Sequence, residues 1–264
     1  TLSGVTLDMD FAVPAAETLR LSSGLTVTAG NALRLQGGAS SANVLILGDM
    51  TLDGPGSLIF EGTTDNNDVR PLFGGIDLVL GPNLIVGAGS TRGGLIRNFA
   101  TVDNQTTIEV LNPGTGLTLA ATVFTNSNTV RTGPNGGNLS LSGLLNNGLV
   151  ETNTGTTTTL LGNWSNPTGT LQVNGGTLNL DGNFSGLGTF NRPGGAGTVN
   201  LTGTFTNTGN VFTFDDTTGV FNFDTGQITG GTLRKAGSGD LVLTQDSTLS
   251  GVTLDMDFAV PAAE

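Results

Sequence analysis

The first seventeen residues of the chain occur a second time at its end. Residues 1–17 read TLSGVTLDMDFAVPAAE, and residues 248–264 repeat the same letters in the same order. A match of this length does not arise by chance. Residues 1–247 are therefore predicted to be one full period of a tandem repeat, and residues 248–264 the start of the next identical repeat. We expect the chain to be a window of a longer array, in which identical units in series build length.

The composition indicates a folded chain without α-helical periodicity. It contains 43 Gly and 36% hydrophobic residues, and only 11% of its residues are charged. Leu, Val, Ile and Phe recur at alternate positions, which a disordered segment does not need. The glycines have no three-residue period, so a collagen triple helix is excluded. The sequence has no apolar run of about 18 residues, so no membrane-spanning helix is predicted.

A shorter period of about 20 residues lies inside the longer one. Each copy reads Leu, any residue, Gly, any residue, large apolar residue, and the copies are Leu141–Leu145, Leu160–Trp164, Leu180–Phe184 and Leu201–Phe205. Two residues after each large apolar position stands Asn or Gly, the residue types that best tolerate a left-handed backbone. Each copy is therefore predicted to run strand, corner, strand, corner. A copy is too short for a strand–helix–strand unit, which needs about 30 residues.

These patterns predict an all-β fold, a parallel β-helix (β-solenoid) with about 12 coils of roughly 20 residues in each 247-residue period. The large apolar residues should form a core stack made of Leu145, Trp164, Phe184 and Phe205. The corner asparagines should form a ladder of side-chain amides made of Asn126, Asn147, Asn166 and Asn207. The alternative for these asparagines is a set of exposed turn residues.

One segment near the C-terminus has a family-like motif. Residues 231–244 read GTLRKAGSGDLVLT, followed by Leu249-Ser250-Gly251. This segment resembles the passenger-associated transport repeat of bacterial autotransporters, although Gln245 stands where that family usually has Gly, and a Tyr is missing. The resemblance implies a right-handed parallel β-helix at the bacterial cell surface. The rest of the chain is similar, more loosely, to filamentous surface adhesins rich in Asn, Gly and Thr.

The residues available for catalysis are few. The chain has no His, Cys or Tyr, so general bases and nucleophiles are reduced to carboxylates, one Lys and hydroxyl groups. Asp215-Asp216 is the one acidic pair that resembles a glycosidase site, which needs two carboxyl groups in a cleft. Adjacent strand residues point to opposite faces, so a corner suits this pair better. We expect no catalytic residues.

Two acidic segments offer oxygen ligands for Ca²⁺. Asp65, Asn67 and Asp68 lie in a segment that breaks the coil spacing, and Asp8 and Asp10 alternate on a predicted strand and recur in the second copy. The first segment lacks the spacing of a known Ca²⁺ loop, and its alternative is a solvated loop. We therefore expect no cofactor, with Ca²⁺ as the one candidate.

The net charge of −12 opposes binding to nucleic acid, which needs clustered Lys and Arg. The expected function is structural: a repeat unit of a long extracellular bacterial filament, sheath or matrix fibre. Its partner would be itself, head to tail along the axis and in lateral bundles, and cell-surface polysaccharide is a further candidate. One alternative is the stalk of an autotransporter-like surface adhesin. Another, from a different class, is a carbohydrate-active β-helix enzyme.

Overall fold

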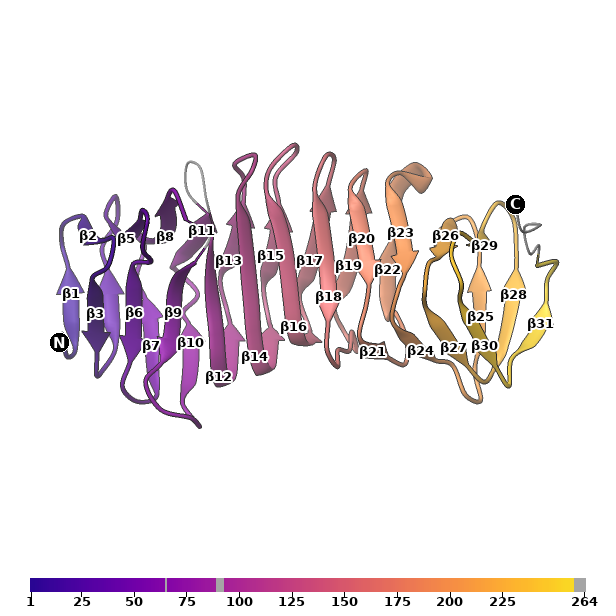
Figure 1. Cartoon of the computed structure of the whole chain (residues 1–264), viewed down its shortest axis with the longest axis horizontal. Coiled ribbons are helices and arrows are strands. Elements are labelled where there is room, and N and C mark those ends of the chain that lie inside the picture. The colour runs from indigo at the N-terminus through magenta and orange to yellow at the C-terminus, as the bar shows by residue number, and fades with distance from the viewer. Residues whose placement is uncertain (65, 89–92, 259–264) are drawn as a thin grey trace.

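The chain folds into an elongated parallel β-solenoid of about 11 turns of about 22 residues. The computed structural model describes residues 1–64, 66–88 and 93–258. The N-terminus lies at one end of the solenoid and the last turns of the chain lie at the other (Figure 1). Within the described residues there is no α-helix, and the one helical segment is a short 3-10 turn, Pro193–Gly195.

Each turn has three sides, and strands on one side pair in parallel with the strands of the turns before and after. Side 1 contains β3 (Thr18–Leu21), β6 (Asn43–Ile46), β9 (Asn67–Pro71), β18 (Thr157–Leu161), β20 (Thr177–Leu180), β23 (Thr198–Leu201), β26 (Val220–Phe223) and β29 (Asp240–Leu243). Side 2 contains β1 (Val5–Leu7), β4 (Leu25–Val27), β7 (Met50–Asp53), β10 (Asp77–Leu80), β21 (Asn183–Phe184), β24 (Thr204–Thr206), β27 (Gln227–Thr229) and β30 (Thr248–Ser250). Three long strands continue from side 1 around the corner to side 2: β12 (Gly94–Asn104), β14 (Gly116–Asn126) and β16 (Asn138–Asn146).

Side 3 completes each turn. It contains β2 (Phe11–Pro14), β5 (Ala32–Gly37), β8 (Ser57–Gly62), β11 (Ile85–Ala88), β13 (Thr107–Val110), β15 (Thr129–Thr132), β17 (Leu149–Asn153), β19 (Thr170–Asn174), β22 (Thr189–Asn191), β25 (Val211–Phe214), β28 (Thr232–Lys235) and β31 (Thr253–Asp255). The predicted all-β parallel solenoid is confirmed, with turns slightly longer and fewer than expected.

Turn length varies along the chain, which explains why the turns are fewer and longer on average than the sequence predicted. Asn126 and Asn146 occupy one corner in successive central turns and are 20 residues apart. In the N-terminal turns, Asp49 and Asp77 lie on neighbouring turns and are 28 residues apart. Longer connections between strands account for the additional residues, and they were not visible in a repeat that is regular only in the second half of the chain.

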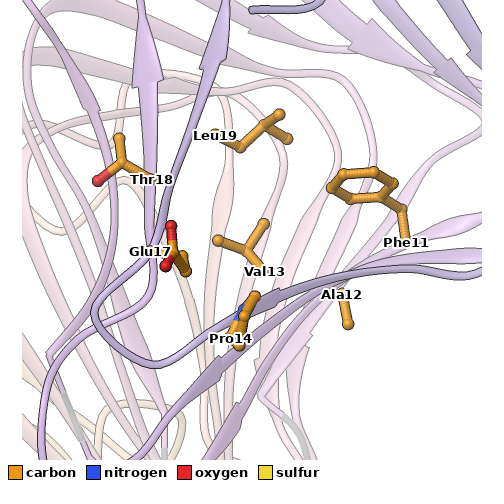
Figure 2. A pocket seen from close by; sticks show the side chains of 7 residues that line it. All are labelled: Phe11, Ala12, Val13, Pro14, Glu17, Thr18 and Leu19. Carbon is orange, nitrogen blue, oxygen red and sulfur yellow. The ribbon is translucent and has the colours of Figure 1, made fainter.

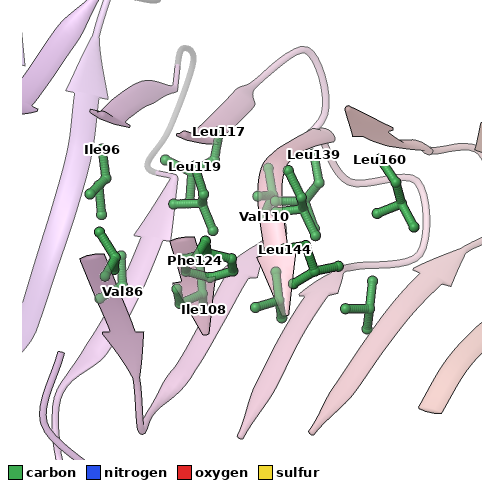
Figure 3. Packing of buried hydrophobic residues seen from close by; sticks show 14 of the residues in the cluster. Val86, Ile96, Ile108, Val110, Leu117, Leu119, Phe124, Leu139, Leu144 and Leu160 are labelled. Carbon is green, nitrogen blue, oxygen red and sulfur yellow. The ribbon is translucent and has the colours of Figure 1, made fainter. Parts of the chain in front are cut away.

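The core is a set of columns that run along the axis, because inward residues of successive turns stand in register. One column on side 3 contains Phe11, Leu33, Leu58, Val86, Ile108, Val130, Val150, Leu171 and Phe190. Side chains from the three sides meet in the interior (Figure 3). Burying one such side chain contributes about 1.5–3 kcal/mol, so every turn stabilises its neighbours.

Candidate functional site

A ladder of buried asparagine side chains runs along the corner between sides 2 and 3. The Nδ2 atom of Asn104 donates to Oδ1 of Asn126 at 2.8 Å, Asn126 donates to Asn146 at 2.7 Å, and Asn146 donates to Asn166 at 2.8 Å. Each Nδ2 also donates to a backbone carbonyl. All four residues are buried. A chain of satisfied amides of this kind fixes the position of each corner over the next.

The structure places the predicted ladder residues unequally. Asn126 and Asn166 are members, whereas Asn147 is exposed and the preceding residue, Asn146, takes the buried place. Asn207 is buried at the same corner, but its Nδ2 donates to the Thr232 carbonyl at 3.2 Å rather than to another amide. Gly186 stands between Asn166 and Asn207 in the sequence pattern and has no side chain to continue the ladder. The sequence analysis did not predict Asn104 as a member, although Asn104 follows the buried Val102 by two residues, the same offset as in the other copies.

Three aromatic rings from successive turns stack on one another along the axis in the interior. The ring centroids of Trp164 and Phe184 are 4.3 Å apart with planes inclined by 17°, and those of Phe184 and Phe205 are 5.1 Å apart with planes inclined by 7°. Trp164 Nε1 donates to the Asp181 carbonyl at 2.7 Å, so the one polar atom of the indole is satisfied. The three rings form part of the hydrophobic core.

The fourth predicted member of the stack was assigned one residue too late. Leu144 is buried, whereas Leu145 is only half-buried. Ser142 stands in register with Leu161 of the next turn. The inward position lies two residues after Ser142, at Leu144, but three residues after Leu161, at Trp164. The shorter corner moves both the inward position and the ladder position back by one residue, from Leu145 to Leu144 and from Asn147 to Asn146.

The first predicted Ca²⁺ segment is used for packing between turns. Asp65 lies outside the described residues. Asn67 is buried, with Oδ1 accepting from the Ala42 amide at 3.2 Å and Nδ2 donating to the Glu61 carbonyl at 2.6 Å. Asp68 is also buried, and its Oδ2 contacts Arg97 at 2.9 Å and Arg70 at 3.2 Å. This hydrogen bond to Asp68 raises the pKa of Arg97.

The second predicted Ca²⁺ segment lies at the corner between β1 and β2 rather than on a strand. Asp8 accepts from the Thr28 hydroxyl at 2.9 Å, and Asp10 accepts from the Ala32 amide at 2.8 Å. Both bonds join the first turn to the second. Among the described residues, no group of three or more acidic, His or Cys side chains is placed to hold a metal ion.

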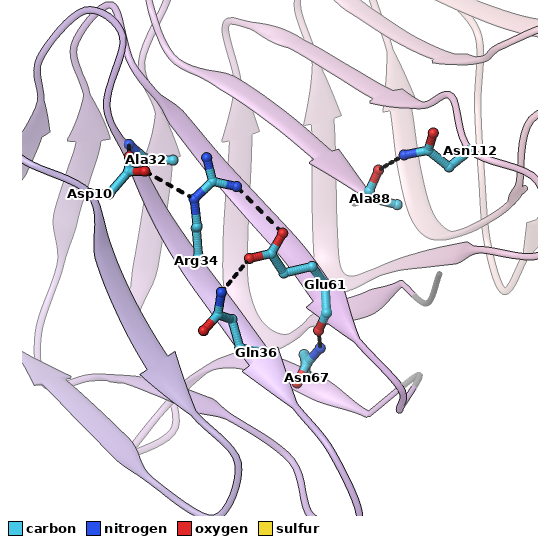
Figure 4. Close-up of polar contacts among 8 residues, drawn as sticks. All are labelled: Asp10, Ala32, Arg34, Gln36, Glu61, Asn67, Ala88 and Asn112. Atoms are coloured by element: carbon cyan, nitrogen blue, oxygen red, sulfur yellow. Dashed lines mark hydrogen bonds and ion pairs between the residues drawn. The ribbon is translucent and has the colours of Figure 1, made fainter. Parts of the chain in front are cut away.

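Charged side chains pair across neighbouring turns on the outer surface. Arg34 lies between Asp10 and Glu61, at 3.5 and 3.4 Å, and so joins three successive turns on side 3 (Figure 4). Further along the same side, Arg131 and Glu109 are paired at 2.8 Å. Arg34 and Arg131 thus link adjacent turns on this side.

One buried cation was not expected from the sequence. The Arg192 guanidinium donates to the carbonyls of Ala196, Gly197, Thr218 and Val220. Burial lowers the pKa of Arg192. These bonds fasten the 3-10 turn to the following turn of the solenoid, which indicates a structural role for this residue.

The acidic pair Asp215-Asp216 lies in a corner. Asp215 Oδ1 accepts from the amides of Thr217 and Thr218, both at 2.9 Å. Asp216 Oδ1 accepts from the amide and the hydroxyl of Ser238, both at 2.7 Å. These bonds to Ser238 lower the pKa of Asp216, whereas the general acid of a glycosidase needs a raised pKa. The geometry is that of a turn stapled to its neighbour.

The two ends of the solenoid expose strand edges. Among the described residues, β1 and β2 pair only with the following turn, through β4 and β5. At the other end, β30 and β31 pair only with the preceding turn, through β27 and β28. At the N-terminal end, Phe11, Val13 and Leu19 point toward a shallow hollow (Figure 2). Uncovered edges of this kind are templates for a further strand.

These features define the class of protein as a parallel β-solenoid. In its described residues, side-chain ladders connect the turns, and the strand edges at both ends are uncovered. Comparison with known proteins adds no family: no family model matches the chain, and no curated protein or solved structure is significantly similar to it. The autotransporter-like segment forms β28, a turn and β29. No helix in the described part of the chain is long and apolar enough to cross a membrane.

Proposed function

We propose that this chain is a structural unit of a long extracellular bacterial filament, sheath or matrix fibre, in which solenoid turns continue from one unit into the next. The observation that carries the proposal is the duplicated segment. Its first copy pairs along the edge that faces the following turn, and its second copy pairs along the edge that faces the preceding turn. A turn inside a continuous solenoid pairs with both the preceding and the following turn. The two copies together make both of these pairings.

The apolar residues of the ends support the same function. Leu254 stands in register with Leu233, which is fully buried, and therefore points toward the interior. It is nevertheless 42% exposed, because no further turn covers it within the described residues. Covering it with another turn would remove this apolar surface from water. Each unit is thus suited to receive another at its end.

Electron microscopy of native material tests this function. We expect uniform threads far longer than one unit. Each unit should add about 50–55 Å to the length, because about 11 turns rise by roughly 4.8 Å each. Isolated rods of one-unit length in native material would contradict the proposal.

The autotransporter-like motif in residues 231–244 favours a second candidate, the stalk of a surface adhesin whose binding region lies elsewhere. In that case microscopy of cells would show short rods attached to the cell surface. Partners other than the chain itself, such as cell-surface polysaccharide, remain part of this second proposal. A carbohydrate-active enzyme has no comparable support from the bonds of Asp215 and Asp216.

A further inference from the structure

The two copies of the duplicated segment lie on different sides of the solenoid. In the first copy, Leu2 bridges to Leu21 of β3 on side 1, and β1 lies on side 2. In the second copy, Leu249, the equivalent of Leu2, pairs with Ile228 of β27 on side 2. The strand that follows, β31, pairs with β28 on side 3. The second copy is therefore displaced by one side relative to the first.

The displacement preserves the inward and outward pattern of the segment. Leu7 stands over Val27, and its equivalent Leu254 stands over Leu233. Both of these partners are buried core residues. The same leucines thus face the interior in both copies, although the copies occupy different sides. The shift is possible because every side of the coil has a column of inward apolar residues, so the same leucines can be buried on any side.

Chain length fixes the displacement at the second copy. Only residues 244–247 separate β29, on side 1, from β30. Four residues can turn one corner, but they cannot also pass along a complete side before β30 begins. The second copy must therefore start on side 2 as long as β29 occupies side 1.

We infer that successive units in the fibre are rotated by about one third of a turn, about 120°, in addition to the twist that accumulates over the turns. This inference rests on the proposed function. One period then contains about 11 turns and one further side. A joint with this rotation keeps the pairings seen at both ends of the chain. A joint without it must break one of the two sets.

The rotation has a mechanical consequence. Any bend that is built into one unit points in a different direction in each of the next two units. Three bends directed about 120° apart cancel, so the fibre stays straight over every three units. Each surface feature of a unit is likewise presented on three sides of the shaft, so lateral contacts are not confined to one side.

Cysteine cross-linking in a two-unit chain, residues 1–247 followed directly by residues 1–264, tests the inference. The sequence contains no Cys, so an introduced pair is the only thiol pair present. Thr253→Cys with Thr232→Cys joins the pair seen on side 3. Thr253→Cys with Gln227→Cys joins the positions that would be neighbours if the second copy lay on side 2 like the first. Thr6→Cys with Thr26→Cys, a pair already in register, is the matched positive control.

Mild oxidation followed by thiol titration and mass spectrometry reads out the bonds. We expect near-complete bond formation for the 232–253 pair and for the control, and little for the 227–253 pair. Formation of the 227–253 bond instead, or of both test bonds equally, would overturn the rotation and leave the proposed function standing. Failure of both test bonds while the control bond forms would overturn the rotation and the proposed function together.

Electron cryomicroscopy of an unsubstituted three-unit chain is the second measurement. Its outcome does not depend on whether the cysteine variants fold. The 3-10 turn Pro193–Gly195 marks one side of each unit. We expect this turn to point in three directions about 120° apart after correction for the twist measured within one unit. Three such turns aligned on one side after the same correction would overturn the rotation.

Discussion

The N-terminal turns, residues 1–88, and the central turns, residues 94–191, solve the same stacking problem in different ways. In the N-terminal turns the spacing between neighbouring turns changes, as the 28 residues between Asp49 and Asp77 show. Ion pairs such as Arg34 with Asp10 and Glu61 connect these turns. In the central turns the spacing stays near the 20 residues that separate Asn126 from Asn146. There a buried ladder of amides connects the turns.

The difference shows what a side-chain ladder requires. An amide can bond to the same amide of the next turn only if each turn brings that residue to the same corner at the same depth. Constant turn length provides this condition, and loops of changing length remove it. Long charged side chains tolerate the variation because they reach partners at several positions, but exposed pairs contribute less to stability than buried amides.

The largest expected effect concerns the aromatic stack of the central turns. Trp164→Ala should lower the free energy of unfolding by about 3–5 kcal/mol, because it opens a cavity between Leu144 and Phe184. Urea denaturation followed by circular dichroism measures the change. Leu145→Ala, at the half-buried neighbouring position, should cost no more than about 1 kcal/mol. Similar losses for the two variants would contradict the assignment of the core column.

The ladder is tested by two adjacent asparagines. Asn146→Ala should cost about 2–4 kcal/mol, because it leaves buried partners in Asn126 and Asn166 unsatisfied. Asn147→Ala should change stability by less than about 0.5 kcal/mol, because Asn147 is exposed. The same urea titration compares the two variants. If Asn147→Ala were the more damaging, the corner would have to be shifted by one residue.

The ion pairs of Asp68, which join the N-terminal turns to Arg97 of the first central turn, should contribute less than the ladder, and salt should weaken them. Asp68→Asn removes the charge that faces Arg70 and Arg97, whose side chains are 42% and 44% exposed. We expect a loss of about 1 kcal/mol at low ionic strength after allowing for this exposure. The loss should shrink in 1 M salt, where the screening length is about 3 Å. The cost of Asn146→Ala should be unchanged by salt, and an equal response of both variants would remove the distinction between the ion pairs and the amide ladder.

The smallest expected effect is a pH dependence in the C-terminal turns. The pKa of Asp216 is lowered in the folded chain by its bonds to Ser238. The ionised form thus stabilises the fold above the ordinary pKa of an aspartate, and this contribution disappears as the pH falls through the lowered pKa. NMR titration should show the shift in the native chain and a return toward the ordinary value in Ser238→Ala. The backbone amide of residue 238 is retained in this variant, so the return should be partial, and an unchanged pKa would rule out a contribution from the Ser238 hydroxyl.

Much of the fold was predictable because the repeat carries its own evidence. Trp164, Phe184 and Phe205 recur at nearly equal spacing, and an inward column is the simplest arrangement that buries all three. The one-residue errors arose where the sequence is degenerate. Leu144 and Leu145 are both leucine, and Asn146 and Asn147 are both asparagine, so composition gives no reason to prefer either member. Arg192 was missed because its partners are backbone carbonyls, which no side-chain pattern reveals.

By itself the sequence established that one segment is duplicated, and it predicted the parallel stacking of short strands and the residue types at the corners, since these follow from spacing and from the preference of each residue for water or core. Only the tertiary structure decided which leucine and which asparagine face inward. It also decided that the two identical ends lie on different sides of the coil. These choices depend on how many residues each corner consumes, and that number is set by backbone geometry in three dimensions rather than by local preference.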